Sequence, residues 1–353
     1  MSLDFISGLG LSIPLIQAPM AGTSTPALAA AVCNAGALGS IAVGTLTPEA
    51  AAQDIARLRA ATDRPFNVNL FVHAPCKADP PREAAWLDSL APAFAEFDAE
   101  PPAQLETIYP TLVGNAEMLD TLVDLAPPVV SFHFGLPEAE AIAALKAAGC
   151  LLLATATSLD EARRAKDTGI DGVVAQGWEA GGHRGVFDPD APDDRLGTLA
   201  LTRLLAAQSG LPVIAAGGIM DGAGIRAALD LGAVAAQLGT AFVACPESNA
   251  DAAYRAALAS ESARHTTMTA AISGRPARCL ANRFTALAAS EALPPVAPYP
   301  RAYHAGKALN VAAKAAGEGG FGAQWAGQGA PLSRPMPAAQ LVAQLAAELA
   351  ATR

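Results

Sequence analysis

The sequence has no cluster of lysine and arginine, and its formal net charge is −10. Proteins that bind nucleic acid carry basic patches that neutralise phosphate charge, so we expect no nucleic-acid partner. The apolar stretches are short and interrupted by glycine, proline or charged residues, so none predicts a transmembrane helix. Residues 1–17 contain Asp4 and no basic segment, which argues against a secretory signal peptide and favours a cytoplasmic protein.

Cysteine and histidine patterns typical of metal sites are also missing. The five cysteines lie far apart and form no CxxC pair: Cys33, Cys76, Cys150, Cys245 and Cys279. This spacing favours neither a zinc site nor a disulfide framework, and reduced thiols are the simplest interpretation. The five histidines form no HExxH motif, so the sequence predicts no metal site.

Aromatic residues make up only 5% of the chain, whereas 52% of its residues are hydrophobic. Eight short apolar runs alternate with helix-like segments, a pattern that predicts an α/β fold of the (β/α)8 TIM-barrel type. An open, doubly wound sheet is the alternative, but no GxGxxG motif follows the first run. The predicted strands are 15–18, 38–43, 66–71, 129–134, 151–155, 172–176, 212–216 and 234–238.

Two segments interrupt this alternation. Residues 73–114 are rich in proline and predict an insertion after the third strand. Residues 246–335 separate the eighth strand from a final helix with one apolar face, formed by Leu341, Val342, Leu345 and Leu349. We therefore expect a barrel made of residues 1–245 and 336–353, with 246–335 inserted as a lid over the carboxyl ends of the strands.

Glycine-containing turns follow the last two predicted strands. Gly217-Gly218 ends the seventh and Gly239-Thr240 the eighth, where many barrels bind a phosphate on bare backbone N–H groups. Ordinary strand-ending turns are the alternative. A flat ligand attached to such a phosphate would reach the barrel axis; FMN fits, and so does a sugar or nucleotide phosphate. The polar and thioether side chains expected there are Met20, Asn69, Gln176 and Gln237.

Residues 176–185 read QGWEAGGHRG and follow a predicted buried strand. Gly181 and Gly182 expose backbone directly before His183, a side chain that titrates near neutral pH. A structural glycine-rich turn needs neither Glu179 nor His183, so we interpret this segment as an active-site loop. His133, at the carboxyl end of its strand, is a secondary catalytic candidate, and a structural core histidine is the alternative. Two loop histidines are expected at the surface, His73 and His265.

Residues 299–307 read YPRAYHAGK, which predicts a helix that begins near Pro300. Tyr299, Tyr303 and Lys307 share one face of this helix, so two phenols and an ammonium group are available to bind a small anion. The alternative is an amphipathic lid helix whose polar face is exposed to solvent. Tyr109 lies in the first insertion and is a further candidate for substrate binding.

Several motifs together resemble the nitronate monooxygenases, formerly called 2-nitropropane dioxygenases. The motifs, in the order of that family, are QAPMAG, NVNLF, QGWEAGGHRG, AAGGI and QLGTAF. The resemblance runs from about Leu15 to Lys307, and YPRAYHAGK is similar to the C-terminal signature of the class I enzymes. Flavin-dependent enoyl-ACP reductases and NADH:quinone reductases carry loops similar to EAGGHRG. An NAD(P)H-dependent flavin reductase on the same barrel is therefore the nearest alternative, followed by a non-catalytic barrel that binds a phosphate ligand.

The resemblance implies an enzyme that uses FMN, takes no metal, and oxidises alkyl nitronates with O2 as a detoxification reaction. Propionate 3-nitronate is the substrate it implies. His183 would lie over the flavin, and Lys307 with the tyrosines would bind the substrate anion. The segments that match FMN-contacting segments contain Met20, Asn69, Gln176, Gly181, Gly182, Gly217, Gly218, Gly239 and Thr240. The oligomeric state is not predicted.

Overall fold

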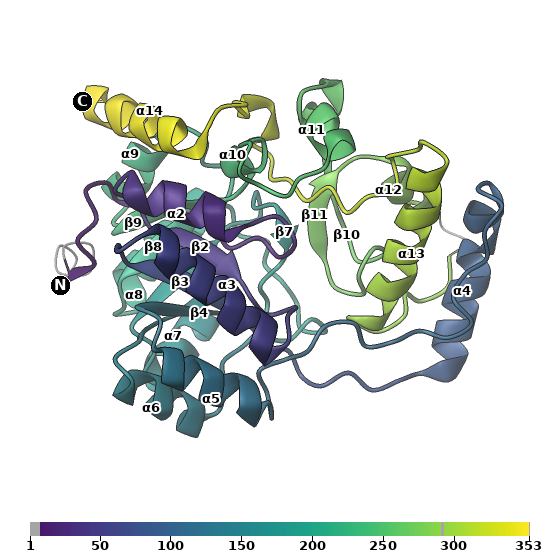
Figure 1. The fold of residues 1–353 in the computed structure, drawn as a ribbon, viewed down its shortest axis with the longest axis horizontal. Coiled ribbons are helices and arrows are strands. Elements are labelled where there is room, and N and C mark those ends of the chain that lie inside the picture. Colours follow the sequence, from purple (N-terminus) through teal and green to yellow (C-terminus); the bar gives the residue numbers. More distant parts are fainter. Residues whose placement is uncertain (1–7, 291–292, 353) are drawn as a thin grey trace.

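The computed structural model describes residues 8–290 and 293–352, so Asp4 and the other residues before Gly8 lie outside it. Its centre is a barrel of eight parallel strands that pair in chain order (Figure 1). A parallel bridge between Ile16 and Leu38 closes the barrel, so the TIM-barrel prediction is confirmed. The barrel strands are β1 (Leu15–Gln17), β2 (Gly39–Ala42), β3 (Phe66–Phe71), β4 (Val129–His133), β5 (Leu151–Ala156), β6 (Gly172–Gln176), β8 (Val213–Ala216) and β9 (Ala235–Leu238).

Strand β3 shows how the barrel separates its two faces. Val68 and Leu70 are buried in the apolar core between the strands and the surrounding helices. Asn67 and Asn69 alternate with them and therefore face the barrel interior. There Asn69 donates a hydrogen bond of 2.9 Å to Oγ of Ser131 on the neighbouring strand. Polar amides at alternate positions thus mark the inner face of the barrel.

The helices around the barrel begin at side chains that cap free backbone N–H groups. Thr25, Ser158 and Asp221 each accept a hydrogen bond from the N–H three residues further along. No helix in the described part of the chain is both long and apolar enough to cross a membrane. These helices are α2 (Pro26–Asn34), α3 (Pro48–Ala61), α5 (Ala116–Leu125), α6 (Ala139–Ala147), α7 (Leu159–Asp167), α8 (Thr198–Gln208) and α9 (Gly222–Asp230).

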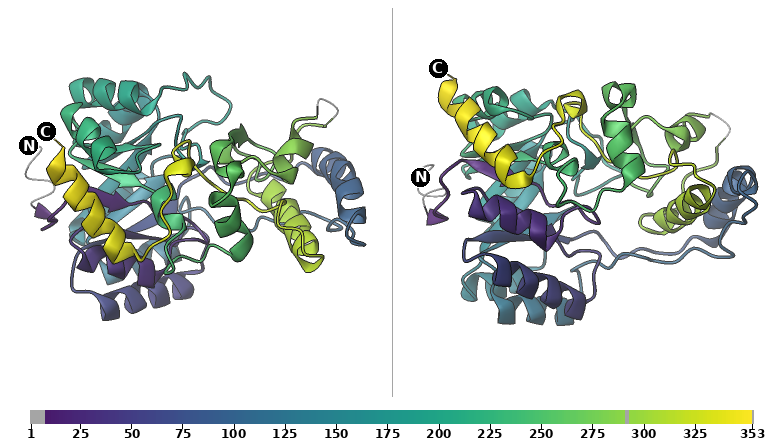
Figure 2. Two further views of the ribbon diagram at one scale, coloured as in Figure 1. Left: turned by 90° about the horizontal axis from the view of Figure 1, so that it is seen from above. Right: turned by 45° about the horizontal axis from the view of Figure 1, so that its top comes forward.

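Helix α14 (Ala338–Ala351) returns to the barrel after the long insertion. It packs against α2 and α9 and completes the helical wall (Figure 2). Leu341, Val342 and Leu345 are buried there, on the face that their spacing predicts.

The two insertions pack together beside the barrel. Helix α4 (Pro80–Ala95) from the first insertion lies along α13 (Arg301–Ala315) from the second (Figures 1 and 2). Trp86 and Phe94 of α4 share an apolar cluster with Leu309 of α13. The sequence does not predict this contact, because nothing local shows that two segments so far apart share a core. The other helices of this body are α11 (Ala252–Leu258) and α12 (Arg283–Ala288), and short helix α10 (Thr240–Val243) leads into it.

A small antiparallel sheet joins this body to the barrel. It consists of β7 (Gly182–His183), from the loop after β6, and the hairpin strands β10 (Thr266–Thr269) and β11 (Ala277–Leu280). Strand β11 is the central strand and pairs His183 with Ala277. The glycine-rich loop is therefore held by a hairpin from the insertion.

Candidate active site

A pocket opens at the carboxyl ends of the barrel strands. His133, His183, Tyr109 and Tyr303 lie in its wall. Tyr299 and Lys307 do not line the pocket but lie directly behind this wall, as their ring and cation contacts show. All the residues expected to bind the cofactor line it: Met20, Asn69, Gln176, Gly181, Gly182, Gly217, Gly218, Gln237, Gly239 and Thr240.

Gly217 and Gly218 line the pocket with bare backbone, and packing against the protein leaves neither room for a side chain. Both have positive φ angles, +128° and +70°. A Cβ on Gly217 would lie 2.6 Å from Oγ1 of Thr198, and one on Gly218 would lie 3.3 Å from Cβ of Glu179. Bare backbone at the end of β8 can therefore approach a ligand phosphate closely. The backbone N–H groups of these close-packed glycines fit the phosphate of a phosphorylated flavin.

The segment 325–329 covers the same end of the pocket. The N–H of Gly327 donates to Oγ1 of Thr240 over 3.0 Å. A Cβ on Gly181 would lie 2.5 Å from N of Gly327, and a Cβ on Gly329 would lie 2.7 Å from the main-chain oxygen of Gly218. The sequence does not predict that residues 325–329 cover the pocket. Their glycines become informative only when this segment is seen against the backbone of Gly181 and Gly218.

Gln176 and Glu179 both have structural partners in the histidine loop. The Gln176 amide donates to the main-chain oxygen of His183 over 2.9 Å and accepts from N–H of Gly185 over 2.7 Å. The Glu179 carboxylate accepts hydrogen bonds from the N–H and Oγ1 of Thr198, at the start of α8. Helix capping therefore accounts for Glu179, contrary to our inference that an active-site loop was needed to explain it.

His183 is held from its backbone and from its ring. Its Nε2 lies 2.8 Å from Oγ of Ser273, which is fully buried. Burial lowers the pKa of His183 to about 3, and nearby His133 and Arg275 act in the same direction. The ring is therefore neutral near neutral pH.

His133 has partners on both ring nitrogens. Nδ1 lies 3.0 Å from Oγ1 of Thr155, and Nε2 lies 3.1 Å from the main-chain oxygen of His183. Burial lowers the pKa of His133 to about 4. The geometry therefore couples His133 to the loop that carries His183.

His73 is buried, so the expectation that it lies at the surface was wrong. It is 3% exposed, and its ring centroid lies 5.0 Å from that of Tyr299 in an edge-on contact. Burial lowers the pKa of His73 to about 4. The chain stays paired beyond β3, since the N–H of Val72 donates to the main-chain oxygen of His133, and this carries His73 inward. His265 is exposed, as expected.

Helix α13 begins at Arg301, so Tyr299 precedes it and does not share a helical face with Tyr303 and Lys307 as expected. Both tyrosines are buried whereas Lys307 is exposed, so the alternative of a solvent-exposed polar face is wrong for the tyrosines alone. Tyr299 and Tyr303 are each 9% exposed. The Lys307 ammonium lies 4.8 Å from the ring centroid of Tyr109 and 5.6 Å from that of Tyr303, and burial lowers its pKa. A cation and two phenol rings thus stand together at the edge of the pocket.

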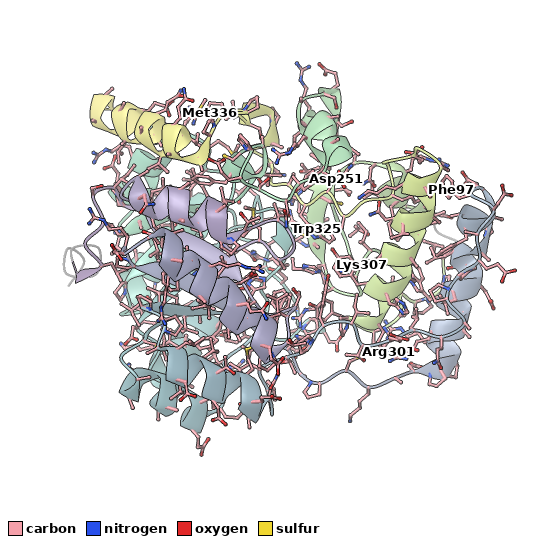
Figure 3. The ribbon with its side chains drawn as sticks, in the orientation of Figure 1. Phe97, Asp251, Arg301, Lys307, Trp325 and Met336 are labelled. Atoms are coloured by element: carbon pink, nitrogen blue, oxygen red, sulfur yellow. The ribbon has the colours of Figure 1, made fainter. Side chains whose placement is uncertain are left out.

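Three residues near His183 were not identified from the sequence. The Trp325 ring centroid lies 5.0 Å from that of His183, and Figure 3 shows Trp325 between the barrel and α13. The buried guanidinium of Arg275 lies 4.4 Å from the centroid of the Phe134 ring. Phe134 itself has a φ of +77°, a strained value for an aromatic residue.

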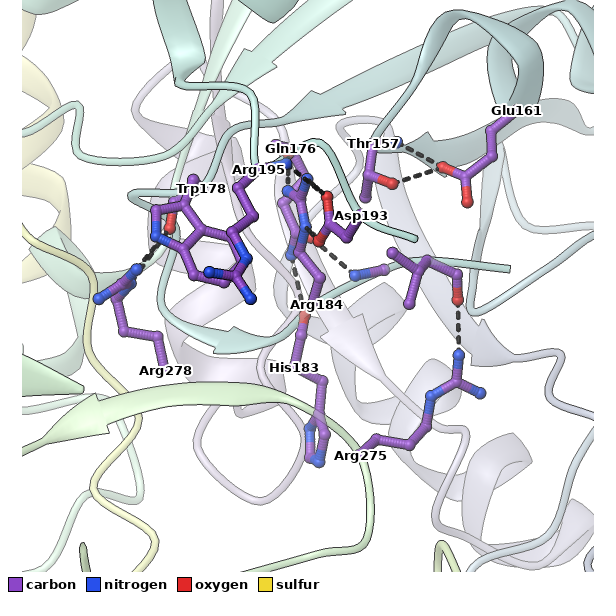
Figure 4. A network of polar contacts seen from close by, with 12 residues as sticks. Thr157, Glu161, Gln176, Trp178, His183, Arg184, Asp193, Arg195, Arg275 and Arg278 are labelled. Atoms are coloured by element: carbon purple, nitrogen blue, oxygen red, sulfur yellow. Dashed lines mark hydrogen bonds and ion pairs between the residues drawn. The ribbon is translucent and has the colours of Figure 1, made fainter. Parts of the chain in front are cut away.

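A network of polar contacts holds the loop after β6 (Figure 4). Buried Arg184 binds the Asp193 carboxylate over 2.7 Å and donates to the main-chain oxygen of Gln176. Arg278 donates to the main-chain oxygen of Trp178 over 2.9 Å. The arginine of the GGHRG segment is therefore structural. Within residues 8–290 and 293–352, no group of three or more His, Cys, Asp or Glu side chains is placed to hold a metal ion.

A closed parallel barrel with a ligand pocket at the carboxyl ends of its strands defines the class of TIM-barrel enzymes. The family model described as nitronate monooxygenase matches residues 5–348. The chain therefore belongs to the nitronate monooxygenase family, whose members are flavin-dependent oxidoreductases.

Known proteins support this assignment over almost the whole chain. The chain is 62% identical to a nitronate monooxygenase of Paraburkholderia phytofirmans, over 94% of this chain and 91% of that protein. It is 56% identical to one of Pseudomonas aeruginosa, over 94% and 95%. A nitroalkane oxidase from Streptomyces ansochromogenes has a similar structure, with a TM-score of 0.89, 42% identity and coverage of 99% and 98%. FabK from Thermotoga maritima gives a TM-score of 0.74 at 29% identity, with coverage of 99% and 95%.

Proposed function

We propose that this enzyme uses FMN and O2 to oxidise alkyl nitronates, releasing a carbonyl compound and nitrite or nitrate. Propionate 3-nitronate is the substrate that we propose, and removal of this toxic anion in the cytoplasm is the proposed role. One observation carries the proposal. The residues expected to bind flavin line the same pocket as Tyr109, and the Lys307 ammonium lies over the ring of that tyrosine. The family membership supports the same chemistry.

We assign the FMN phosphate to the glycines after β8 and β9, with the Thr240 hydroxyl beside it. Met20, Asn69 and Gln237 would contact the ring system, because they lie nearer the barrel axis. Nδ2 of Asn69 donates to Ser131. Within the described structure Oδ1 of Asn69 accepts no hydrogen bond, so this oxygen is available to a ligand. When bound, FMN supplies the acceptor for electrons of the nitronate and the site at which O2 is reduced.

The electrostatics of the pocket favour an anionic substrate. Among the described residues, none of the side chains in its wall belongs to Asp, Glu, Lys or Arg. Two cations lie behind the side of the wall that carries His183 and Tyr109: Lys307 over the ring of Tyr109 and Arg275 over the ring of Phe134. Since burying an unpaired anion is costly, these cations and the phenol O–H groups would offset the cost of binding a nitronate.

The low pKa of His183 favours a substrate that arrives already deprotonated. An efficient general base has a pKa near the working pH, whereas burial holds that of His183 near 3. Removal of a proton from a neutral nitroalkane would therefore be slow. A nitronate has already lost that proton, so the site needs only to bind and orient it against the flavin.

We also propose that residues 246–335, with 73–114, act as a lid on the barrel of residues 1–245 and 336–353. The lid supplies Tyr303 and Trp325 to the pocket wall, and the first insertion supplies Tyr109. It would exclude bulk water from the bound anion and flavin.

The main competing activity is an NAD(P)H-dependent flavin reductase on the same barrel. Anaerobic mixing distinguishes the two activities. The yellow enzyme should lose its flavin absorbance with a nitronate and keep it with NADH or NADPH. Rapid bleaching by a nicotinamide, without bleaching by a nitronate, would overturn the proposal. A purified protein without bound flavin would favour a non-catalytic phosphate-ligand barrel.

A further inference from the structure

The hairpin β10–β11 holds His183 in place. Its strand β11 pairs with β7 and places Ala277 opposite His183. The N–H of Arg184 donates to the main-chain oxygen of Pro276 over 2.8 Å, which extends the pairing by one residue. The turn of the hairpin thereby brings Ser273 against the ring of His183. Backbone and ring of the histidine are thus both fixed by the same inserted segment.

Ser273 is completely buried and has three polar contacts. Its Oγ lies 2.8 Å from Nε2 of His183, 3.2 Å from the main-chain oxygen of Arg275 and 3.4 Å from the N–H of Arg275. A hydroxyl has one proton to donate and two lone pairs that accept. Only one assignment of protons satisfies all three contacts at once.

The Arg275 contacts decide that assignment. A carbonyl oxygen can only accept, so the Ser273 hydroxyl must donate its proton to Arg275 O. The backbone N–H of Arg275 can only donate, so it occupies one Ser273 lone pair. The remaining lone pair faces Nε2 of His183 and requires a proton on that nitrogen. The reverse arrangement would leave a lone pair of Ser273 Oγ facing a lone pair of the Arg275 main-chain oxygen at a fully buried position.

We propose that Ser273 is a positioning residue that fixes neutral His183 in the Nε2–H tautomer. Nδ1, which has no hydrogen bond to any residue in the described structure, is then the acceptor nitrogen of the ring. His183 can accept a proton or a hydrogen bond in the pocket but cannot donate one to a nitronate oxygen. Donors for the nitronate must come from other groups instead, such as Tyr109 and Tyr303, whose side chains line the pocket. This last consequence rests on the proposed function, whereas the tautomer does not.

Nitrogen-15 NMR of the holoprotein labelled at histidine tests the tautomer directly. The chain has five histidines, and the variant His183→Asn identifies the signal of His183 by its loss. The expected spectrum shows a protonated Nε2 and an unprotonated Nδ1 for His183 at neutral pH. A proton on Nδ1 in the wild-type protein would overturn the proposal, whatever any variant shows.

The variant Ser273→Ala tests the cause. It should turn the single tautomer into a mixture or into the Nδ1–H form, and an unchanged His183 signal would overturn the proposal. Ser209→Ala is the matched control, because buried Ser209 makes the same contacts with the N–H and the main-chain oxygen two residues ahead but has no histidine. This control should leave the His183 signal unchanged. A change of equal size in Ser209→Ala would show a general effect of lost stability and would overturn the proposal.

Kinetics of the same variants test the role of His183 in turnover separately from the role of Ser273 in fixing the tautomer. With a nitroalkane, Ser273→Ala should lower kcat by roughly 10- to 100-fold and leave KM nearly unchanged, since a misplaced base slows proton transfer more than binding. Ser209→Ala should keep both constants. If the tautomer changes in Ser273→Ala but kcat does not, the assignment of His183 to turnover fails while the role of Ser273 stands.

Discussion

Nε2 of His133 lies 3.1 Å from the main-chain oxygen of His183. Because a carbonyl oxygen only accepts, Nε2 of His133 carries the proton, and Nδ1 accepts from Oγ1 of Thr155. Both ring nitrogens are thus engaged, and burial keeps the pKa of His133 low, at about 4. His133 therefore supports the loop that carries His183, and does so in its neutral form.

The hydrogen bond from His133 to the main-chain oxygen of His183 should contribute to the stability of the fold. His133→Ala should destabilise the fold by about 1–3 kcal/mol, because it leaves the buried carbonyl of His183 with one hydrogen bond fewer. His133→Gln should recover part of the loss, since its amide can donate to the same oxygen. Urea unfolding measures the difference. Equal stabilities of the alanine and glutamine variants would contradict the role of the hydrogen bond.

Lys307 should determine affinity for a dianionic substrate. Lys307→Met should raise KM for propionate 3-nitronate, whose carboxylate adds a second charge, and should change KM for a simple alkyl nitronate much less. Lys314→Met is the control, because Lys314 lies on the same helix but pairs with Asp251 away from the pocket. Steady-state kinetics with both substrates decide the matter. Unchanged constants for both substrates in Lys307→Met would refute an electrostatic contribution of Lys307 to substrate binding.

The bare backbone at Gly218 should be needed for FMN. Gly218→Asp forces a side chain against Glu179 and adds a negative charge beside the proposed phosphate position, so the purified variant should contain little flavin. Gly149→Asp is the control, because Gly149 also has a positive φ, +90°, but follows α6 away from the pocket. Flavin content is read from the absorbance of the purified protein. A folded Gly218→Asp variant with full flavin would show that the phosphate lies elsewhere.

His73 should make the protein less stable in acid. Its pKa is about 4 when folded and returns to about 6.5 on unfolding, so the unfolded chain binds the proton more tightly. This penalty is absent above about pH 6.5 and grows as the pH falls towards 4. Between pH 7 and 5 it should remove about 2 kcal/mol from the free energy of unfolding.

The variant His73→Gln isolates this contribution. Its free energy of unfolding should fall less between pH 7 and 5 than that of the wild-type protein. His265→Gln removes an exposed histidine and should leave the wild-type difference intact. The same pH dependence in His73→Gln and wild type would mean that His73 is not held neutral by burial.

Local patterns were sufficient for the barrel and for much of the pocket. Strands buried on both faces produce apolar runs, and glycines after β8 and β9 mark places where backbone must be bare. Contacts between distant segments could not be read in this way. Ser273 follows His183 by 90 positions, and only the pairing of β11 with β7 brings them together. His73 looked like a loop residue, because the pairing that extends beyond β3 leaves no periodic signal.

The central claim is that the enzyme oxidises nitronates rather than neutral nitroalkanes. Initial rates of O2 consumption and nitrite release should be compared for propionate 3-nitronate and its conjugate acid at equal concentration. The nitronate should react on the order of 100-fold faster, because His183 is a poor base at neutral pH. His183→Asn should slow the neutral substrate further and affect the nitronate less. Equal rates for both substrates, or no O2 consumption with the nitronate, would contradict the account.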